Sequence, residues 1–396
     1  MRASRLFYVF ALVLSLGAAP AVRAQTVPAI TGTPTLDTPT NLLDWEYEFP
    51  KEPANLDEPT ANRLSDLHGE VFGCDLAITT AGNYHMALKD LTQYYLHVFA
   101  TDRGGKSWQY TTSPPIGYDA VKSSVTQFGN LASRCRPQIA VAPATELEKL
   151  RTPPDDFVAG KIVPVIRNYG NVILVKKGNP KRINSVWDLG RPHVRVATPS
   201  PTSEPGSFGN YSGSIYRIAY NQYYAPAGST DPTYCQLNPR ECRDMTPEEL
   251  FNRIFNETGD QGEDKSDGEH EGRGKWLAGA RIHHREVPWS IAYGRADAGL
   301  IFYHLAKHAV AMFPDKFEMV PLGGTVEAPA PLPGNNVGVM SMACIKAPEF
   351  TPAQIAARDR MAQAYMSTEF DGILATYGLR RPDKFDATRA AFQACK

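Results

Sequence analysis

The chain has 396 residues, of which 42% are hydrophobic and 21% are charged, a balance typical of a soluble globular protein. This length exceeds what one simple core supports and predicts two lobes or domains. The formal net charge of −1 excludes the strongly basic character that wholesale binding to nucleic acid or to an anionic membrane surface requires.

Residues 1–24 have the three parts of a secretory signal peptide. Arg2 and Arg5 give a positive start, residues 7–16 form a short apolar stretch, and "VRA" precedes Gln25 as a cleavage signal. The apolar stretch is too short to span a membrane. The residue directly after the cleavage point is Gln25 and not a cysteine, so we expect an exported, periplasmic protein without a lipid anchor. A buried N-terminal helix is the alternative interpretation. Residues 25–65 are rich in Pro and Thr and predict an extended arm.

Six cysteines fit an oxidising compartment and are disulfide candidates. They are Cys74, Cys135, Cys235, Cys242, Cys344 and Cys395. Cys235 and Cys242 close a short loop and are the simplest pair to propose. Cys74 and Cys135 each precede an apolar run, so they can pair if those runs form neighbouring strands. Spacing alone does not choose among the pairings. A zinc site is the weaker interpretation, because no C-x-x-C spacing occurs.

From residue 66 the hydrophobic pattern alternates between two periods. "DLAITT" predicts a strand, residues 82–99 a helix with one apolar face, "SWQYTTS" a strand and residues 120–132 a helix. "PQIAVAPATELEKL" predicts a strand and then a helix. Strands that alternate with helices indicate crossover units and a parallel sheet.

A second alternation begins near residue 161. Residues 161–180 hold two strand-like stretches, "SVWDLG" predicts a short helix and "VRVATPS" a strand. A loop over 201–213 precedes a helix over 214–224, and a long polar region spans 225–274. Residues 288–296 predict a helix, followed by the strands "DAGLIFY" and "FEMVPLG". The final segment, residues 351–370, predicts one amphipathic helix with Thr351 as the expected N-cap and Pro352 in the first helical position. The whole pattern predicts two α/β halves, with the last helices covering the first half.

Three sequence blocks resemble the molybdate/tungstate type of periplasmic solute-binding protein. They are "YGNVILVKKGNPKRINSVWDLGRPHVRVATPSPTSEPG", "GRADAGLIFYHLA" and "MAQAYMSTEFDGILATYGLRRP". The resemblance implies a type II periplasmic binding protein fold, with two α/β lobes whose mixed, mostly parallel sheets are joined by two hinge strands. These crossings are expected near residues 162–171 and 320–337. Lobe 1 then comprises residues 66–165, lobe 2 residues 166–325, and residues 326–396 return to lobe 1.

The resemblance also implies a solute receptor. From the exported chain with its even number of cysteines we expect a monomer, and from the missing catalytic motifs a protein that is not an enzyme and has no cofactor. Such a receptor captures a small anion, molybdate-like, in a cleft between the lobes and passes it to the permease of an ABC importer. The chain departs from the family pattern in several places. The tyrosine that ends the family's "G-I-V-Y" segment aligns with Phe302, which has no hydroxyl to donate, and "HHRE" is not part of the usual pattern. The N-terminal arm and the polar region 225–274 also make the chain longer than typical family members.

In open α/β sheets, ligands bind beyond the carboxyl ends of strands, where the unpaired N–H groups of helix N-termini suit an oxyanion. Three strand-to-helix turns and the helix entrance "HHRE" have this form. The candidate ligand-binding residues are Thr80, Gly82, Asn83, Ser113, Ser203, Gly206, Ser207, His283, His284, Arg285 and Glu286. The alternative for each turn is an ordinary N-cap or a loop that Pro and Gly favour.

In "HHRE", Arg285 is the expected main charge of the second lobe, because a guanidinium forms two parallel hydrogen bonds with an oxyanion. The alternative is a solvated helix entrance in which Glu286 favours the helix dipole. A metal ion or metal chelate is the second candidate ligand, and a sensor that lost transport is a third function. The candidate metal ligands are His85, Glu204, His283 and His284. No G-x-S-x-G, H-E-x-x-H or phosphate-loop motif predicts catalysis.

Overall fold

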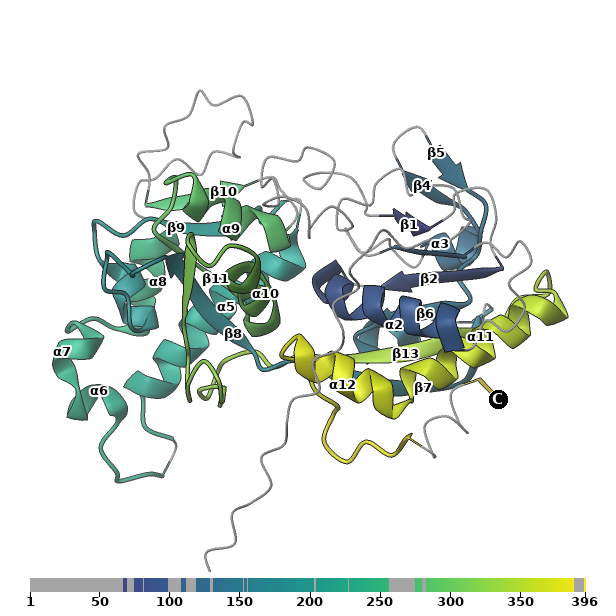
Figure 1. Ribbon diagram of the computed structural model, residues 1–396. Coiled ribbons are helices and arrows are strands. Elements are labelled where there is room, and N and C mark those ends of the chain that lie inside the picture. The colour runs from purple at the N-terminus through teal and green to yellow at the C-terminus, as the bar shows by residue number, and fades with distance from the viewer. Residues whose placement is uncertain are drawn as a thin grey trace, which may run out of the picture.

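The computed structural model describes residues 67–69, 75–80, 82–98, 108–111, 119–128, 131–151, 153–154, 156–202, 204–226, 228–255, 275–279, 283–387 and 395–396. The expected signal peptide (1–24) and arm (25–65) lie outside these residues. The described chain forms two α/β lobes, each built on its own mixed sheet (Figure 1). None of the described helices has the length and hydropathy that a membrane span requires.

Lobe 1 is built on a six-stranded sheet in the order β1-β3-β2-β6-β13-β7. Its strands are β1 (Leu67–Gly69), β2 (Leu76–Thr80), β3 (Trp108–Thr111), β6 (Ile139–Ala142), β7 (Val158–Arg167) and β13 (Val339–Ile345). β2 runs parallel to β3 and β6, whereas β13 runs antiparallel to β6 and β7. Every residue of β2 and β6 is buried, which fits their continuous apolar runs and a sheet covered on both faces.

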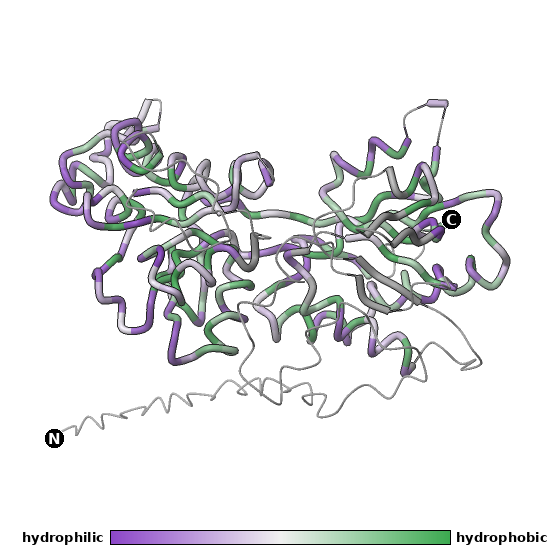
Figure 2. Tube along the Cα trace, turned by 90° about the horizontal axis from the view of Figure 1, so that it is seen from above, coloured by the Kyte–Doolittle hydropathy of each residue, from purple (hydrophilic) through white to green (hydrophobic). Residues whose placement is uncertain are grey.

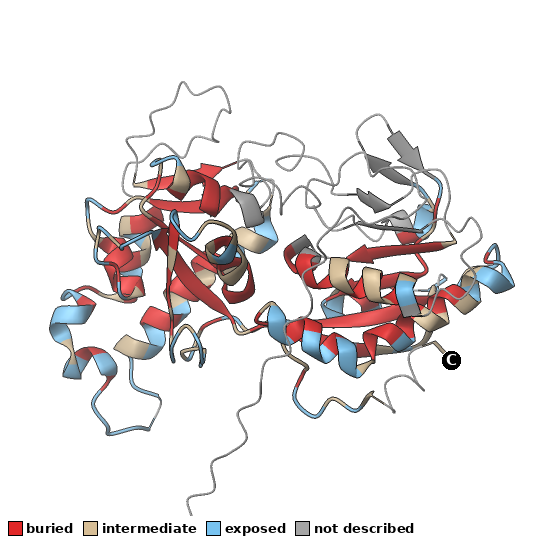
Figure 3. Cartoon of the chain, in the orientation of Figure 1, coloured by how far each residue is buried: buried red, intermediate tan, exposed pale blue. Residues whose placement is uncertain are grey.

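Helices cover both faces of this sheet (Figure 3). α2 (His85–Val98), α11 (Pro352–Tyr365) and α12 (Thr368–Thr376) share one core with it, through Leu91, Met361 and Phe370. α4 (Ala144–Leu147) and η3 (Glu148–Arg151) contribute Leu147 and Leu150 to a second core. The remaining elements of lobe 1 are η2 (Gly82–Tyr84), α3 (Asp119–Ser123) and the hairpin of β4 (Thr126–Phe128) and β5 (Leu131–Ser133).

Lobe 2 is built on a five-stranded sheet in the order β10-β9-β11-β8-β12. Its strands are β8 (Asn171–Lys176), β9 (Val196–Pro199), β10 (Trp276–Gly279), β11 (Ala298–Phe302) and β12 (Phe317–Val320). β9 runs parallel to β10 and β11, and β8 runs antiparallel to β11 and β12. The other elements are η4 (Val186–Gly190), α5 (Pro205–Tyr223), α6 (Tyr234–Leu237), α7 (Pro239–Cys242), α8 (Pro247–Phe255), α9 (His283–Ala292) and α10 (Tyr303–Met312).

The chain crosses between the lobes twice (Figure 2). The first crossing, residues 168–170, joins β7 to β8, and the second, residues 321–338, joins β12 to β13. Asparagine side chains tie the two crossings together. The Asn168 carboxamide oxygen accepts from the backbone N–H of Gly170 and of Gly338, each at 2.9 Å. Asn335 accepts from the Asn171 N–H and donates to the Asn171 carbonyl, each at 2.8 Å. The predicted architecture of two mixed α/β lobes joined by two crossings is confirmed. The sheets are not mostly parallel as predicted, because antiparallel pairs outnumber parallel ones among their described strands.

Three predicted segments differ in the structure. The helix expected over 120–132 is wrong beyond Ser123: Ser124 has a left-handed φ of 54°, which ends α3, and the β4–β5 hairpin follows. The loop expected over 201–213 is helical from Pro205, whose fixed φ suits a first helical position. The polar region after 225 contains α8, where Leu250 and Ile254 lie four residues apart and bury one face.

The C-terminal helices show how local polar residues set helix ends. Thr351 is the N-cap of α11, as predicted, and its hydroxyl accepts from the Gln354 N–H at 3.2 Å. The pattern suggested one helix through residue 370, but the Ser367 hydroxyl accepts from the Phe370 N–H at 3.3 Å. Ser367 is therefore a second N-cap, and α12 starts afresh at Thr368.

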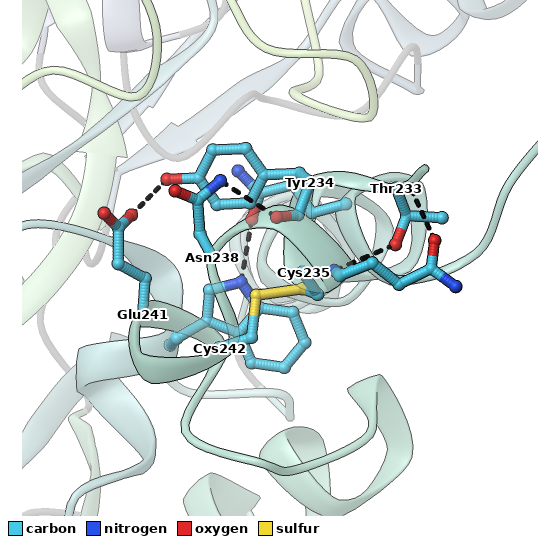
Figure 4. The surroundings of a disulfide bond; sticks show 9 residues. Thr233, Tyr234, Cys235, Asn238, Glu241 and Cys242 are labelled. Atoms are coloured by element: carbon cyan, nitrogen blue, oxygen red, sulfur yellow. Dashed lines mark hydrogen bonds between the residues drawn. A yellow bond between two sulfur atoms is a disulfide. The ribbon is translucent and has the colours of Figure 1, made fainter. Parts of the chain in front are cut away.

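Both lobes contain disulfide bonds. The predicted pair Cys235–Cys242 is confirmed and joins α6 to α7 with Cα atoms 5.5 Å apart (Figure 4). Around it, the Asn238 carboxamide donates to the Tyr234 carbonyl at 2.9 Å and the Tyr234 hydroxyl donates to Glu241. Cys344 pairs with Cys395, which fixes the chain end to β13. Cys135 is also disulfide-bonded, and its expected partner, Cys74, lies outside the described residues.

Candidate functional site

The two crossings, residues 168–170 and 321–338, together form the hinge. This hinge brings the carboxyl edges of the two sheets toward each other. In lobe 1, β2, β6 and β7 run in the same direction, so Thr80, Ala142 and Arg167 end at one edge. The first crossing leaves from Arg167 and enters β8 at Asn171. Asn171 pairs with Phe302, the carboxyl end of β11. The two edges where ligands bind in open α/β sheets are therefore joined by only three residues.

A hydrogen bond and stacked rings connect the lobes directly at this place. The His304 Nε2 of α10 lies 2.5 Å from the Asn83 carbonyl oxygen of η2. Because a carbonyl oxygen can only accept, Nε2 carries the proton. The His304 ring stacks on Tyr84 with centroids 5.0 Å apart and on Phe302 at 5.5 Å. The Phe302 ring in turn meets Tyr211 of α5 edge to face at 5.5 Å.

Four side-chain oxygen atoms in this neighbourhood are buried and have no hydrogen-bond partner within the part of the chain that the structure describes. We call them the four-oxygen set: Thr80 Oγ1, Asn83 Oδ1, Asn171 Oδ1 and Tyr211 OH. Lobe 1 supplies the first two and lobe 2 the last two. A buried polar group without a partner costs about 1–3 kcal/mol, so such groups call for a ligand or water.

The neighbours of each asparagine fix the direction of its carboxamide. The Asn171 Nδ2 donates to Asn210 Oδ1 at 3.0 Å and to Ser214 Oγ at 2.9 Å, which leaves Oδ1 on the other side. The Asn83 side chain forms a hydrogen bond that lowers the pKa of Tyr84, which identifies Asn83 as the donor in that bond. The unpaired atom of both asparagines is therefore the carbonyl oxygen, an acceptor.

Burial keeps the phenols of the site neutral. It raises the pKa of Tyr84 to about 12, although hydrogen bonds from Asn168 and Asn83 act in the opposite direction. Burial raises the pKa of Tyr211 well above its ordinary value and the charge of nearby Glu204 raises it further, although the backbone N–H of Phe302 beside the phenol acts in the opposite direction. At neutral pH the Tyr211 hydroxyl is therefore protonated and able to donate.

In the predicted turn before α5, a carboxylate of the protein itself accepts a hydrogen bond from one of the candidate residues. Glu204 is the N-cap residue of α5, and its Oε2 accepts from the Ser207 hydroxyl at 3.0 Å. The hydroxyl proton of Ser207 is therefore already hydrogen-bonded within the protein. Gly206 is exposed, and nothing lies within 4 Å of the position of an added Cβ. The negative charge of Glu204 also offsets the dipole that was expected to attract an anion here.

Glu286 lies in the first turn of α9 and is fully buried. Its Oε1 accepts from the Ser290 hydroxyl at 2.7 Å. Its carboxyl carbon lies 1.7 Å from where a Cβ on Gly279 would stand, so the carboxylate packs over the end of β10. In this position Glu286 helps to pack α9 against β10. Its contact with a ligand stays a prediction.

Several candidate residues cannot be placed. Ser113 and Ser203 lie outside the described residues. The backbone positions of His283, His284 and Arg285 open α9 and that of His85 opens α2, but their side chains are outside the description. Gly82 starts η2, two residues after Thr80. Within the described residues, no group of three or more His, Cys, Asp and Glu side chains could hold a metal ion.

The sequence pattern missed Tyr84, Asn171, Tyr211 and His304. Tyr211 was hidden because residues 201–213 were expected to form a loop, although "EP" at Pro205 is a helix-start signal. His304 lies two residues after Phe302, the end of the strand "DAGLIF", at a strand-to-helix junction of the kind used to select the other candidates. Asn171 lies inside the hinge segment "RNYGN", where a buried amide leaves no periodic pattern.

Comparison with known families identifies one match. A family model described as "Bacterial extracellular solute-binding protein" matches residues 122–380, more than half of the chain. A search of curated proteins finds no match.

Several solved structures resemble this chain at low identity. Peb3 from Campylobacter jejuni is 16% identical, with 78% of this chain and 100% of that chain covered and a TM-score of 0.41. Iron-bound HitA from Pseudomonas aeruginosa is 13% identical, with coverage of 80% and 91% and a TM-score of 0.43. The periplasmic molybdate-binding protein from Azotobacter vinelandii is 14% identical, with coverage of 78% and 100% and a TM-score of 0.39.

Proposed function

Since the chain belongs to the family of bacterial extracellular solute-binding proteins, we propose that it captures a small solute with an oxyanion group between its two lobes. It then delivers this solute, in the periplasm, to the permease of an ABC importer. The observation that carries the proposal is the four-oxygen set, because its buried atoms come from both lobes and form no hydrogen bond within the described chain.

The two hydroxyls of this set suit an oxyanion. Thr80 and Tyr211 each have an O–H group to donate, and the pKa of Tyr211, raised by burial, keeps its proton in place at neutral pH. Hydrogen bonds to a charged acceptor contribute about 1.5–3 kcal/mol each. A solute that accepts from both hydroxyls bridges the lobes and favours the closed arrangement, because it binds that state better.

Arg285 is the proposed source of positive charge. Its backbone lies in the first turn of α9, the helix that follows the carboxyl end of β10. A guanidinium there would pair with the oxyanion, and its removal would cost on the order of 2–5 kcal/mol of binding. Lysine would replace the charge but not the planar fork, so Arg285→Lys should also weaken binding.

The test is a thermal-shift and calorimetry panel on the mature chain. It uses molybdate, tungstate, sulfate, phosphate, small carboxylates and divalent metals, with and without chelator. A ligand at one hundred times its dissociation constant adds about 2.7 kcal/mol to the free energy of unfolding. We expect stabilisation by at least one oxyanion-bearing compound that survives chelator.

Two tyrosines of α5 provide a matched pair of variants. Tyr211→Phe removes a buried hydroxyl of the four-oxygen set and should weaken binding roughly tenfold or more. Tyr220→Phe changes an exposed residue on the same helix and should leave binding unchanged. Stabilisation by divalent metals alone, lost with chelator, would contradict the proposal.

A further inference from the structure

We infer that the solute carries hydrogen-bond donors of its own beside its acidic group, as a hydroxy acid or an amino acid does, and is not a bare tetraoxoanion. This inference rests on the proposed function and specifies the chemical class of solute for the same site. Its basis is the chemistry of the four-oxygen set: two hydroxyls that can donate and two carboxamide oxygens that can only accept.

A bare tetraoxoanion satisfies only half of this set. Sulfate, molybdate and tungstate offer acceptors alone, so they can take hydrogen bonds from Thr80 and Tyr211. Asn83 Oδ1 and Asn171 Oδ1 would then face oxygen lone pairs in a buried place, which is costly. A solute with an O–H or N–H group beside its acid would satisfy all four atoms.

Rotation of the carboxamides does not remove the mismatch. If Asn171 were reversed, its oxygen would face Asn210 Oδ1 and its two donor bonds would be lost. The other bonded atom, Ser214 Oγ, accepts from the Asn171 amide and also from the Asn336 N–H at 3.2 Å. Asn210 and Ser214 of α5 therefore orient the Asn171 amide, and its carbonyl oxygen is the atom left unpaired.

A charge of lobe 2 points the same way. Glu204 lies at the N-terminus of α5, close enough to Tyr211 for its charge to raise the pKa of that phenol. This carboxylate opposes a second negative charge and favours a hydroxyl or ammonium group on the side of the solute that faces Tyr211.

The experiment compares acids that differ in one substituent. Calorimetry on the mature chain uses acetate, glycolate and glycine; propionate, lactate and alanine; and succinate, malate and aspartate. In each set the parent acid, its hydroxy derivative and its amino derivative share one carbon skeleton. Sulfate, molybdate and tungstate form the tetraoxoanion arm, and hydrogen phosphate, which has its own O–H, is kept apart from that arm.

We expect at least one hydroxy or amino acid to bind tenfold or more tightly than its parent acid and than every tetraoxoanion. Asn83→Leu removes one acceptor of the set and should reduce this ratio to below threefold, whereas Tyr220→Phe should preserve it. The inference is overturned if a tetraoxoanion binds most tightly, or if the substituted acids bind no better than their parents. In both cases the proposed capture of an oxyanion would stand. If neither arm nor phosphate binds, the proposed function itself is wrong.

Discussion

Asn335 supports the hinge through its side chain alone, and this allows a sharp prediction. Its carboxamide accepts from the Asn171 N–H and donates to the Asn171 carbonyl, each at 2.8 Å, in place of a backbone neighbour. Asn171 is 1% exposed, so Asn335→Ala leaves two backbone groups buried without partners. Each lost bond contributes about 0.5–1.5 kcal/mol and each unpaired group costs about 1–3 kcal/mol. Water entering the space left by the amide recovers part, so we expect a loss of about 2–4 kcal/mol.

The adjacent residue is a matched control. Asn336 is an exposed residue of the second crossing, and its hydrogen bond to α5 is made by its backbone N–H, which donates to Ser214 Oγ at 3.2 Å. Asn336→Ala keeps this bond and should change the free energy of unfolding by less than about 0.5 kcal/mol. Urea unfolding of both variants measures the difference. Equal stability of the Asn335→Ala variant and the parent, or equal losses in both variants, would refute the hinge role of this side chain.

Three further predictions concern stability. Gly279→Ala should cost about 3 kcal/mol or more in urea unfolding, because its Cβ would collide with the buried Glu286 carboxylate; a loss below 1 kcal/mol contradicts that packing. Replacing both Cys235 and Cys242 by Ser opens a loop with a sequence separation of 7. The entropy of loop closure predicts that the free energy of unfolding falls by about 2–3 kcal/mol. An unchanged melting temperature would contradict this prediction. Burial raises the pKa of Tyr84 from 10.0 to about 12. The stability that its neutral phenol contributes is therefore complete below pH 10 and is lost as the pH rises through 12. Tyr84→Phe should flatten this decline in a pH series of unfolding curves, and an equally steep decline in the variant would contradict the prediction.

Local signals in the sequence predicted the elements better than the contacts between them. The N-cap at Thr351 and the Cys235–Cys242 pair depend on residues a few positions apart, and both are confirmed. Thr80 and Asn83 were selected as the end of a strand and the start of a helix, and the structure places them there. Their role in binding stays a prediction.

The interlobe contacts have no comparable local signal. The hydrogen bond between His304 and Asn83 joins residues 221 positions apart, and Asn335 meets Asn171 across 164 positions. Such pairs depend on how the two sheets are brought together by the hinge, which no period of hydrophobic residues encodes. The left-handed backbone of Ser124, which ends α3 early, is likewise set by the turn that follows it.

The most direct test of solute capture between the lobes is a crystal structure of the mature chain with the compound that binds it most tightly. The proposal predicts a solute whose polar atoms lie within hydrogen-bond distance of atoms from both lobes, including Thr80 Oγ1 and Tyr211 OH, and whose donor groups meet Asn83 Oδ1 or Asn171 Oδ1. A solute bound to one lobe alone, with all four of these atoms still without partners, would contradict it.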